Sequence, residues 1–479
     1  MPVINPVQAP PPAGVAATID ALIDRARGAQ RAVERYTQAQ ANDLVAAVAW
    51  SGYKRENAQR LARLAVADTG LGRYEDKVSK IQRKTFGALR DMLDSNATSV
   101  GVIREDRAHG LTYIAKPVGV VAALCPSTNP AATLINKTMM ALKGLNAVIV
   151  APSPKGAKTC ALAVELIRRE LQRIGAPADL VQILPEPISK EPTNELMRKC
   201  DLVVVTGSQS NVRAAYSSGT PAIGVGAGNV PVMVDADADL DDAAAKIKAS
   251  KVFDYATSCS SENSLLIDST IYDEALDALR RQGGYLLSAE QKRQLEVVMF
   301  AGGKLSPKII AQSPRAVADA VGFDDPAAFD AEFFMVEEEG IGPDYPFSGE
   351  KLSVVLTIYR YASFDEGLRT MQRILDNAGM GHSCGIHTKN EAHVAKMAEE
   401  MNVVRVIVNQ AHCFANGGSF DNGMGFTLTM GCGSWAKNSI SENLSYKHFI
   451  NTLHVVRLIP PSEPSEQELF GGYWARHGT

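Results

Sequence analysis

The sequence lacks any hydrophobic run that is long enough to cross a membrane. Its apolar stretches, such as Val118–Leu124 and Leu202–Val205, have the length of β-strands, whereas a bilayer span needs about 18 or more apolar residues. A strong charge of one sign is also missing, because 49 basic and 53 acidic residues leave a net charge of −4 over 479 residues. Neither a membrane nor a nucleic acid is therefore expected as a partner.

Cysteine is scarce and shows no pairing pattern. The seven cysteines are an odd number without a Cys-x-x-Cys pair, which argues against a disulfide framework and a zinc knuckle. The eight histidines form no His-x-x-x-His motif, so no metal site is expected. The proline-rich N-terminus has no basic segment ahead of an apolar one, as a signal peptide would. We expect a cytoplasmic protein with a flexible tail at residues 1–15 and a loose acidic tail after Pro461.

The sequence does contain a repeated alternation of short apolar strands and helical segments. Strand patterns occur at Val118–Leu124, Ala147–Val150, Val181–Leu184 and Leu202–Val205, with helical patterns between them. This order predicts a parallel, doubly wound sheet with helices on both faces. A second strand–helix series follows, and the polar stretch 99–116 predicts a hairpin. The pattern therefore predicts the α/β fold class.

Polar turns follow three of these strands, at Pro126–Asn129, Pro152–Lys155 and Thr206–Gln209. Ligands of doubly wound sheets bind at the carboxyl ends of the strands, so these turns are candidate binding segments. Thr206-Gly-Ser208 also opens a helix, where backbone N–H groups would suit a diphosphate. A simple N-cap is the alternative interpretation. By itself, the segment Gly224-x-Gly-x-Gly228 is typical of a tight turn.

Cys259 is the candidate nucleophile. It lies in the small, polar segment Thr257-Ser-Cys-Ser-Ser261, about thirty residues after the glycine-rich turn. Hydroxyl side chains and backbone amides around a thiol are a setting in which the thiolate acts as a nucleophile. A small buried side chain is the alternative, because free cysteine is among the most buried residue types.

The order and spacing of these segments resemble the aldehyde dehydrogenase superfamily over roughly residues 20 to 455. The resemblance is carried by Pro117–Pro130, Val204–Ser208, Gly224–Pro231 and the loop around Cys259. Three segments are similar, more narrowly, to the CoA-acylating branch, which includes one half of the bifunctional aldehyde-alcohol dehydrogenases: Ala214–Asn229, Gly349–Ser353 and Gly431–Asn443. The resemblance implies an enzyme that oxidises a small aldehyde with NAD(P)⁺ and coenzyme A. The domains it implies are a Rossmann-like cofactor-binding domain (16–101 and 118–252), an α/β catalytic domain (253–445) and a small β element for oligomerisation (102–117 and 446–460). Because this element is expected to pair between subunits, we expect a homodimer or homotetramer.

The resemblance also implies a role for each candidate residue. Cys259 attacks the aldehyde, the thiohemiacetal delivers hydride to the nicotinamide, and a thioester remains. The Asn129 amide and the backbone N–H of Cys259 stabilise the developing alkoxide, although Asn129 alone would be interpreted as a turn residue. Glu350, which alone would be interpreted as a surface glutamate, holds the nicotinamide ribose. The residues expected to bind the cofactor are Pro126, Ser127, Pro152, Ser153, Lys155, Thr206, Gly207, Ser208, Gly226, Gly228 and Glu350.

Val225 marks a departure from the hydrolytic members of the superfamily. Those members carry a glutamate at this position, which serves as general base for the deacylating water. Without that base, the thioester is expected to persist until coenzyme A accepts the acyl group. Glu262 lies three residues after the thiol, but we interpret it as a structural or capping residue. The alternatives left open are a hydrolytic enzyme with another base and a non-catalytic scaffold with this fold.

A second departure concerns the dinucleotide. In hydrolytic members, a lysine and often a glutamate contact the adenosine ribose, and here Ala151 and Pro154 occupy these positions, with Lys155 adjacent. The loss of a carboxylate that would repel a 2′-phosphate permits NADP. A similar pair of proline and a basic residue occurs in NAD-dependent acylating members, so both cofactors stay open.

The aldehyde is expected to be small and polar. His382, which matches a histidine of the acylating branch, is a candidate contact of substrate or coenzyme A, together with Arg405 and Thr257. A structural histidine is an equal alternative for His382. The pocket loop 409–420 adds polar side chains. Such a pocket suits an anionic or hydroxylated aldehyde such as sulfoacetaldehyde, with acetaldehyde and propionaldehyde as the other candidates. The polar residues of the loop are His412, Asn416 and Ser419.

Overall fold

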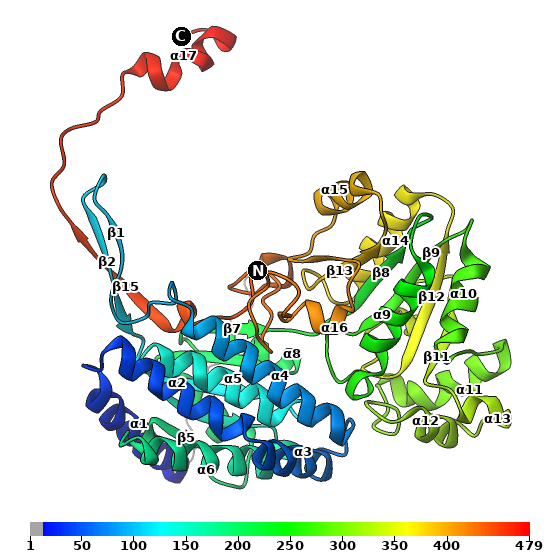
Figure 1. The fold of residues 1–479 in the computed structure, drawn as a ribbon, viewed down its shortest axis with the longest axis horizontal. Coiled ribbons are helices and arrows are strands. Elements are labelled where there is room, and N and C mark those ends of the chain that lie inside the picture. Colours follow the sequence, from blue (N-terminus) through cyan, green and yellow to red (C-terminus); the bar gives the residue numbers. More distant parts are fainter. Residues whose placement is uncertain (1–12) are drawn as a thin grey trace.

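The computed structural model describes residues 13–479 (Figure 1). Helix α1 (Ala13–Val33) begins within the segment predicted to be a flexible tail, and residues 1–12 of that prediction lie outside the described part. The described chain forms two parallel sheets and one small antiparallel sheet, which confirms the predicted α/β class. No helix in residues 13–479 is both long and apolar enough to cross a membrane.

The first sheet has five parallel strands in the order β5-β4-β3-β6-β7. Its central strand β3 consists of apolar residues and is buried along its whole length. Helices α1 and α5 pack against β3 and β4, and α6 packs against β5. The strands are β3 (Val120–Cys125), β4 (Ala147–Pro152), β5 (Val181–Ile183), β6 (Leu202–Thr206) and β7 (Ala222–Val225), and the helices after α1 are α2 (Gln38–Tyr53), α3 (Arg55–Thr69), α4 (Tyr74–Leu93), α5 (Pro130–Lys143), α6 (Ala157–Arg173), α7 (Lys190–Lys199) and α8 (Gln209–Tyr216).

The second sheet has seven parallel strands in the order β10-β11-β12-β9-β8-β13-β14. Strand β8 belongs to this sheet, so the two sheets divide between Val225 and Val230, ahead of the predicted domain boundary at 252. An apolar strand followed by a helix has the same pattern in either sheet, which is why the boundary differs. The strands are β8 (Val230–Val234), β9 (Glu262–Asp268), β10 (Gly284–Leu286), β11 (Phe333–Glu337), β12 (Val355–Tyr361), β13 (Cys384–His387) and β14 (Val406–Val408), and the helices are α9 (Leu240–Val252), α10 (Tyr272–Arg281), α11 (Ala289–Met299), α12 (Pro314–Val321), α13 (Pro326–Phe329), α14 (Phe364–Asn377), α15 (Glu391–Glu400) and α16 (His412–Ala415).

A third, antiparallel sheet extends away from the two parallel sheets (Figure 1). It joins the predicted hairpin, β1 (Gly101–Asp106) and β2 (Leu111–Pro117), to β15 (Ile450–Val456). Its role in oligomerisation stays a prediction. Beyond it lies helix α17 (Glu466–His477), which corrects the expectation of a loose tail after Pro461. A capping box of Ser465 and Glu468 starts this helix, and that signal is present in the sequence.

Asn146 ties the third sheet to the first. Its buried side chain accepts hydrogen bonds at Oδ1 from the N–H groups of Val118 and Gly119, at 2.8 and 3.0 Å. Its Nδ2 donates to the carbonyl oxygens of Ala141 and Phe449, at 2.9 and 2.7 Å. One amide therefore bonds four backbone groups, before β3, at the end of α5 and before β15, of which the Ala141 carbonyl oxygen also accepts backbone N–H groups.

Asn146→Ala should lower the free energy of unfolding by about 3 kcal/mol, because the N–H groups of Val118 and Gly119 and the carbonyl oxygen of Phe449 lose their side-chain partner. Asn136→Ala is the matched control: Asn136 is equally buried, but its Nδ2 has no partner and its Oδ1 accepts only at 3.4 Å. That control should lose about 1 kcal/mol or less. Urea unfolding at fixed protein concentration measures both values. Equal losses in the two variants would contradict the role of Asn146.

Candidate active site

A cavity of about 380 Å³ lies at the carboxyl ends of β3, β6 and β7 and includes the loop before β9. This is the edge of the sheet at which ligand binding is predicted. The cavity thus brings the predicted nucleophile together with most of the residues predicted to bind the cofactor. The predicted site residues that line it are Pro126, Ser127, Asn129, Ser153, Thr206, Gly207, Ser208, Gly226, Thr257, Cys259 and Glu350.

Five predicted site residues lie outside this lining. Pro152 is the buried last residue of β4, and Lys155 is exposed on the turn that follows it. Gly228 packs against the loop that carries the thiol. His382 touches the thiol, and Arg405 is buried behind His382. The structure therefore leaves Lys155 at the surface and places the other four next to the cavity wall or within the core.

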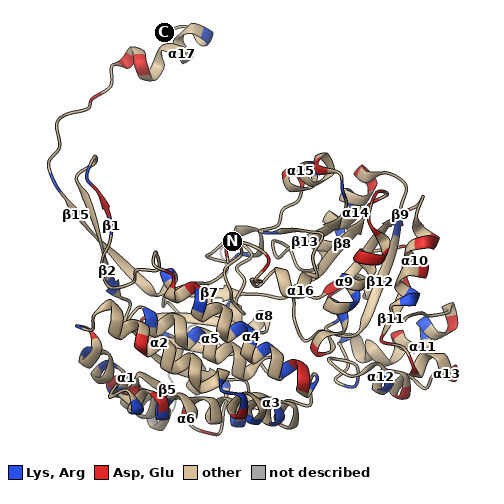
Figure 2. Cartoon of the chain, in the orientation of Figure 1, with Lys and Arg blue, Asp and Glu red and all other residues tan. Residues whose placement is uncertain are grey.

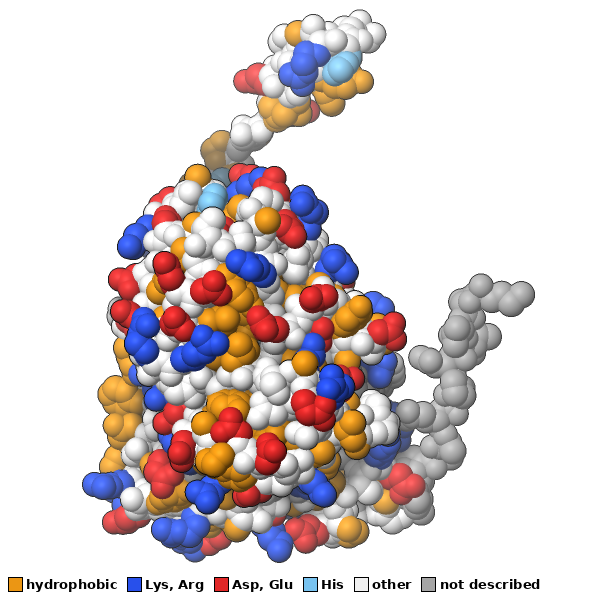
Figure 3. Space-filling view, turned by 90° about the vertical axis from the view of Figure 1, so that its right-hand side faces the viewer, with side chains coloured by type: hydrophobic (Ala, Val, Ile, Leu, Met, Phe, Trp, Pro, Cys, Tyr) orange, Lys and Arg blue, Asp and Glu red, His pale blue; other side chains and the backbone are white. Residues whose placement is uncertain are grey.

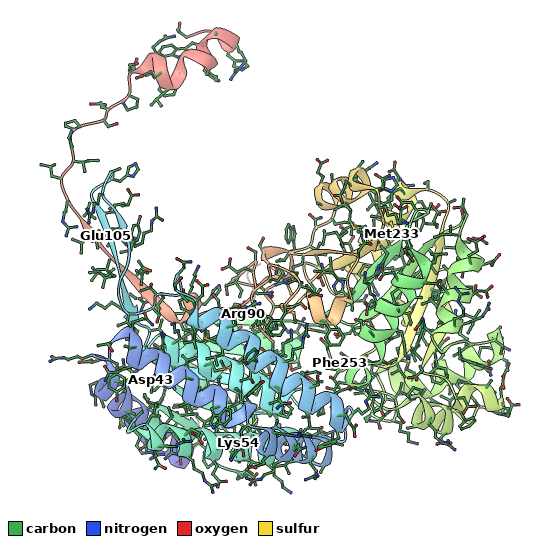
Figure 4. The ribbon with its side chains drawn as sticks, viewed as in Figure 1. Asp43, Lys54, Arg90, Glu105, Met233 and Phe253 are labelled. Atoms are coloured by element: carbon green, nitrogen blue, oxygen red, sulfur yellow. The ribbon has the colours of Figure 1, made fainter. Side chains whose placement is uncertain are left out.

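The loop that carries the thiol is held by a buried carboxylate. It starts at Phe253, which lies between the two parallel-sheet domains (Figure 4). Asp254 and the two residues after it have φ angles of 52°, 50° and 57°, a conformation that residues other than glycine rarely adopt. The Asp254 carboxylate accepts hydrogen bonds from Lys77 Nζ at 3.2 Å and Lys80 Nζ at 2.6 Å. Because both lysines belong to α4, this helix fixes the loop that precedes the thiol.

This cluster of Lys77, Lys80 and Asp254 is absent from the sequence prediction. The available signal is the spacing of the two lysines, three residues apart on one face of a helix. Their shared partner lies 177 and 174 residues away along the chain, respectively. A pair of lysines on a helix is normally a solvated surface, so only the structure identifies them as part of the site.

The glycine-rich turn packs directly against the thiol loop. A Cβ at Gly228 would lie 2.1 Å from the carbonyl oxygen of Cys259, so only glycine fits there. The N–H of Gly228 donates to Oε1 of Glu350 at 3.0 Å. Burial raises the pKa of Glu350 to about 7, against the opposing effect of this hydrogen bond. The glycine-rich turn and the thiol, about thirty residues apart in the sequence, are therefore linked by a close backbone contact between Gly228 and Cys259.

Two hydrogen-bond donors face the cavity beside the thiol. Asn129 precedes α5 but makes no side-chain capping bond, and its Oδ1 accepts from Lys80 Nζ at 2.8 Å. A lysine has only donors, so the amide oxygen must point at it and the Nδ2 group is turned the other way. Neither this group nor the backbone N–H of Cys259 has a partner in residues 13–479. Such a pair can bind an oxyanion that forms on a carbonyl attached to the thiol.

The thiol and its nearest base are both neutral at neutral pH. Cys259 Sγ lies 3.3 Å from Nε2 of His382. Burial, with the nearby Glu350 charge, raises the pKa of Cys259 to about 12, and burial lowers the pKa of His382 to about 3. Ser383 Oγ lies 2.8 Å from His382 Nδ1 and 2.9 Å from His412 Nε2. A hydroxyl has one proton and can donate to only one of these rings, so it couples their tautomers.

The three guanidinium nitrogens of Arg405 all donate hydrogen bonds to acceptors within the protein. Its Nε donates to Oδ1 of Asn443 at 2.9 Å, and its two terminal nitrogens donate to the carbonyl oxygens of His382 and Gly431, at 3.0 and 2.9 Å. Its side chain is buried and does not line the cavity. Arg405 therefore positions the backbone of His382 and joins it to the segment Gly431–Asn443.

The carboxyl end of β6 fits a nicotinamide dinucleotide. Ser208 caps α8 by accepting from the N–H of Asn211 at 3.4 Å, as the capping interpretation predicts. A Cβ at Gly226 would lie 2.2 Å from Nε2 of Gln209, so the glycine keeps space beside the start of this helix. The free N–H groups there suit a diphosphate. No set of three or more His, Cys, Asp or Glu side chains in the described part of the chain could hold a metal ion.

Comparisons with known proteins agree with this geometry. The model of the aldehyde dehydrogenase family matches residues 1–292. The chain is 50% identical over 473 residues to the acylating sulfoacetaldehyde dehydrogenase of Cupriavidus necator, covering 99% of this chain and 95% of that relative. It is 38% identical to the acetylating succinate-semialdehyde dehydrogenase of Clostridium kluyveri, covering 95% and 99% of the two chains. The crystal structure of an acetylating aldehyde dehydrogenase from Geobacillus thermoglucosidasius is similar with a TM-score of 0.90 at 34% identity, covering 94% and 99%.

Gly228→Ala should slow the alkylation of Cys259 by iodoacetamide at least about tenfold, because the new Cβ displaces the thiol loop. Gly226→Ala is the matched control, since its Cβ meets only the flexible end of Gln209. That variant should stay within about twofold of the wild type. The rate is measured without cofactor, and Cys259→Ala gives the background from the other thiols. Equal rates in both glycine variants would contradict the backbone contact.

Proposed function

This chain belongs to the aldehyde dehydrogenase family and is a CoA-acylating enzyme, and we propose that its aldehyde is sulfoacetaldehyde. In this proposal, Cys259 forms a thiohemiacetal with the aldehyde and, after loss of a hydride, a thioester. Coenzyme A then takes the acyl group from the thiol. The observation that carries the proposal is the combination of an attacking thiol with two oxyanion donors in one cavity, and with the apolar Val225 where hydrolytic members carry their general base.

Each of the two carboxylates near the thiol accepts a hydrogen bond through one of its oxygens. Glu350 accepts from the N–H of Gly228, and Glu262 is buried outside the cavity, where its Oε1 accepts the N–H of His412 at 3.1 Å. Val225, at the end of β7, offers no acidic group. Water is therefore poorly activated at this thioester, which favours a thiol as acceptor. This contrast supports acyl transfer to coenzyme A over hydrolysis.

The residues around the thiol have separate roles in the proposed reaction. We infer that the Nδ2 group of Asn129 and the N–H of Cys259 hold the aldehyde oxygen as it becomes an alkoxide. His382, which stays neutral above about pH 4 because its pKa is lowered to about 3, can exchange a proton with the thiol at 3.3 Å. When bound, the nicotinamide ring supplies the acceptor for the hydride. Glu350 and the turn Thr206–Ser208 bind and orient that cofactor in this proposal.

Either dinucleotide fits the turn after β4. Residues 151–156 contain no carboxylate that would repel a 2′-phosphate, and Lys155 is exposed within them. A cation near the adenosine ribose would attract such a phosphate. We therefore propose that the enzyme accepts NADP as well as NAD.

We propose that the protein works in a reducing cytoplasm and forms a homodimer or homotetramer. All seven cysteines are free thiols, including the nucleophile. Acidic and basic side chains are interspersed over the face shown in Figure 3, which gives no support for a nucleic acid as partner. The protruding sheet of β1, β2 and β15 leaves edges that a second subunit can cover.

Without coenzyme A, the enzyme should release about one equivalent of NAD(P)H per active site from sulfoacetaldehyde and then stop, because the thioester persists. Adding coenzyme A should restore steady turnover. Cys259→Ala should lose the burst while it still folds and binds the dinucleotide. A stopped-flow measurement at 340 nm resolves these phases. Steady NAD(P)H formation without coenzyme A would indicate a hydrolytic enzyme, and no NAD(P)H under either condition would indicate a scaffold.

A further inference from the structure

Helix α4 brings buried positive charge to the cavity with too little negative charge to balance it. Lys77, Lys80 and Lys84 are spaced at i, i+3 and i+7, and only 4%, 5% and 8% of their surfaces are exposed. Basic residues recur along this helix in Figure 2. Among the residues described, Asp254 is the one carboxylate that forms ion pairs with these lysines, and it serves both Lys77 and Lys80. Two ammonium groups therefore share a single carboxylate.

The two ammonium groups lie directly behind the cavity wall. Lys80 Nζ donates to Oδ1 of Asn129 and to Oγ1 of Thr257, each at 2.8 Å. Lys77 Nζ donates to the carbonyl oxygen of Thr128 at 3.1 Å. Asn129, Thr257 and Thr128 all line the cavity that contains the thiol. The excess charge is thus separated from a bound aldehyde by a single layer of side chains.

The excess positive charge of Lys77 and Lys80 destabilises the enzyme when no ligand is bound. Burial, together with the charge of Lys80, lowers the pKa of Lys77 to about 8, although Asp254 opposes the shift. A buried cation without its own counter-ion destabilises the folded state. A negatively charged ligand in the adjacent cavity would remove that cost. The arrangement therefore favours an aldehyde that carries an acid group.

We propose that the acid group of the aldehyde, a sulfonate, binds next to Thr257 on the side of the cavity that Lys77 and Lys80 support. This subsite rests on the proposed oxidation of sulfoacetaldehyde and names the residues that select it. In that aldehyde, one CH₂ group separates the carbonyl carbon from the sulfonate. When the carbonyl carbon is at the Cys259 thiol and its oxygen is at Asn129, the sulfonate must lie within a few bond lengths of both. Thr257, two residues before the thiol, is the lining residue that Lys80 contacts there.

Lys77 is the residue at which the subsite can be tested. Lys80 has an acceptor for each of its three N–H groups and orients Asn129, so replacing it would harm the reaction with any aldehyde. Lys77 has two acceptors, which leaves one N–H without a partner among the described residues. In Lys77→Met, Asp254 keeps Lys80, the hydroxyl of Thr257 and the N–H of Arg73 as partners, so the variant should still fold, and its unfolding temperature is measured beside the kinetics.

The experiment compares kcat/KM for sulfoacetaldehyde and propionaldehyde at pH 7 in the presence of coenzyme A. In Lys77→Met, the ratio of the two values should fall at least about tenfold, because only the sulfonate loses an attracting charge. Lys84→Met is the matched control: Lys84 is a buried lysine of the same helix, but its Nζ donates to the carbonyl oxygens of Gly417 and Gly418, which do not line the cavity. That variant should keep the wild-type ratio.

The pH dependence provides a second readout. Lys77 is a cation below its pKa of about 8 and neutral above it, so the wild-type KM for sulfoacetaldehyde should rise between pH 7 and 9. The KM for propionaldehyde should not follow this rise, and Lys77→Met should lack the difference between the two aldehydes. Binding without turnover is measured with 2-hydroxyethanesulfonate, which should raise the unfolding temperature of the wild type more than that of Lys77→Met.

Each outcome separates the subsite from the proposed function. A wild type that prefers propionaldehyde overturns sulfoacetaldehyde as the substrate, and the subsite with it. A wild type that prefers sulfoacetaldehyde, with the same ratio in Lys77→Met, overturns the subsite alone. Equal losses for both aldehydes in Lys77→Met also overturn it, because Lys77 would then act only by holding the loop that carries the thiol. If Lys77→Met does not fold, Lys77→Gln, which keeps a donor without the charge, is judged by the same ratio.

Discussion

The buried carboxylate of Asp254 is the interaction on which the site depends. A carboxylate away from water is tolerated only when its oxygens are hydrogen-bonded. Oδ2 of Asp254 accepts from Lys77, Lys80 and Thr257, and its Oδ1 accepts from the N–H of Arg73. Its own N–H donates to Asp76, again on α4. These contacts hold three successive residues with positive φ immediately before the thiol. The position of the nucleophile is therefore set by a helix of the other domain, and the active site forms only when the two domains are packed together.

The same cluster orients the oxyanion donor. Lys80 binds both the Asp254 carboxylate and the amide oxygen of Asn129, so one ammonium group sets the thiol loop and the direction of the amide. No comparable charge activates the thiol itself, because burial raises the pKa of Cys259. The proton must therefore leave through a neighbouring group during the reaction, and His382 at 3.3 Å is the neutral base in contact with it. Charge is thus concentrated where the alkoxide forms, while the sulfur stays neutral until the substrate arrives.

The sequence is most informative where function depends on local pattern. Asn129 lies in the polar turn after β3 and Cys259 lies in the loop before β9, and the motifs around them resemble a known family closely enough to predict that both belong to one site; the structure places both in one cavity. Lys77 and Asp254 are not predictable in this way, because their pairing depends on how two domains meet. Arg405 is predicted as a contact of substrate or coenzyme A, but its guanidinium is enclosed by backbone carbonyl groups that no pattern reveals. The sheet that β8 joins is not predictable for a similar reason, since a strand–helix pattern does not state which sheet a strand belongs to. Helix α17, in contrast, has a start signal that the sequence alone shows, because its capping box consists of Ser465 and Glu468, three residues apart.

Selectivity for an acidic aldehyde follows from the imbalance of charge behind the cavity. At an effective dielectric constant of about 20, two opposite unit charges about 4 Å apart attract by about 4 kcal/mol, and the attraction weakens in proportion to distance. Even a fraction of that energy exceeds the roughly 1.4 kcal/mol that corresponds to a tenfold preference. A neutral aldehyde of the same size fills the same space but leaves the second lysine without a counter-ion. Lys77 and Lys80 therefore have two roles with an acid-bearing aldehyde. They hold the loop that carries the thiol, and their excess positive charge stabilises the bound acid group.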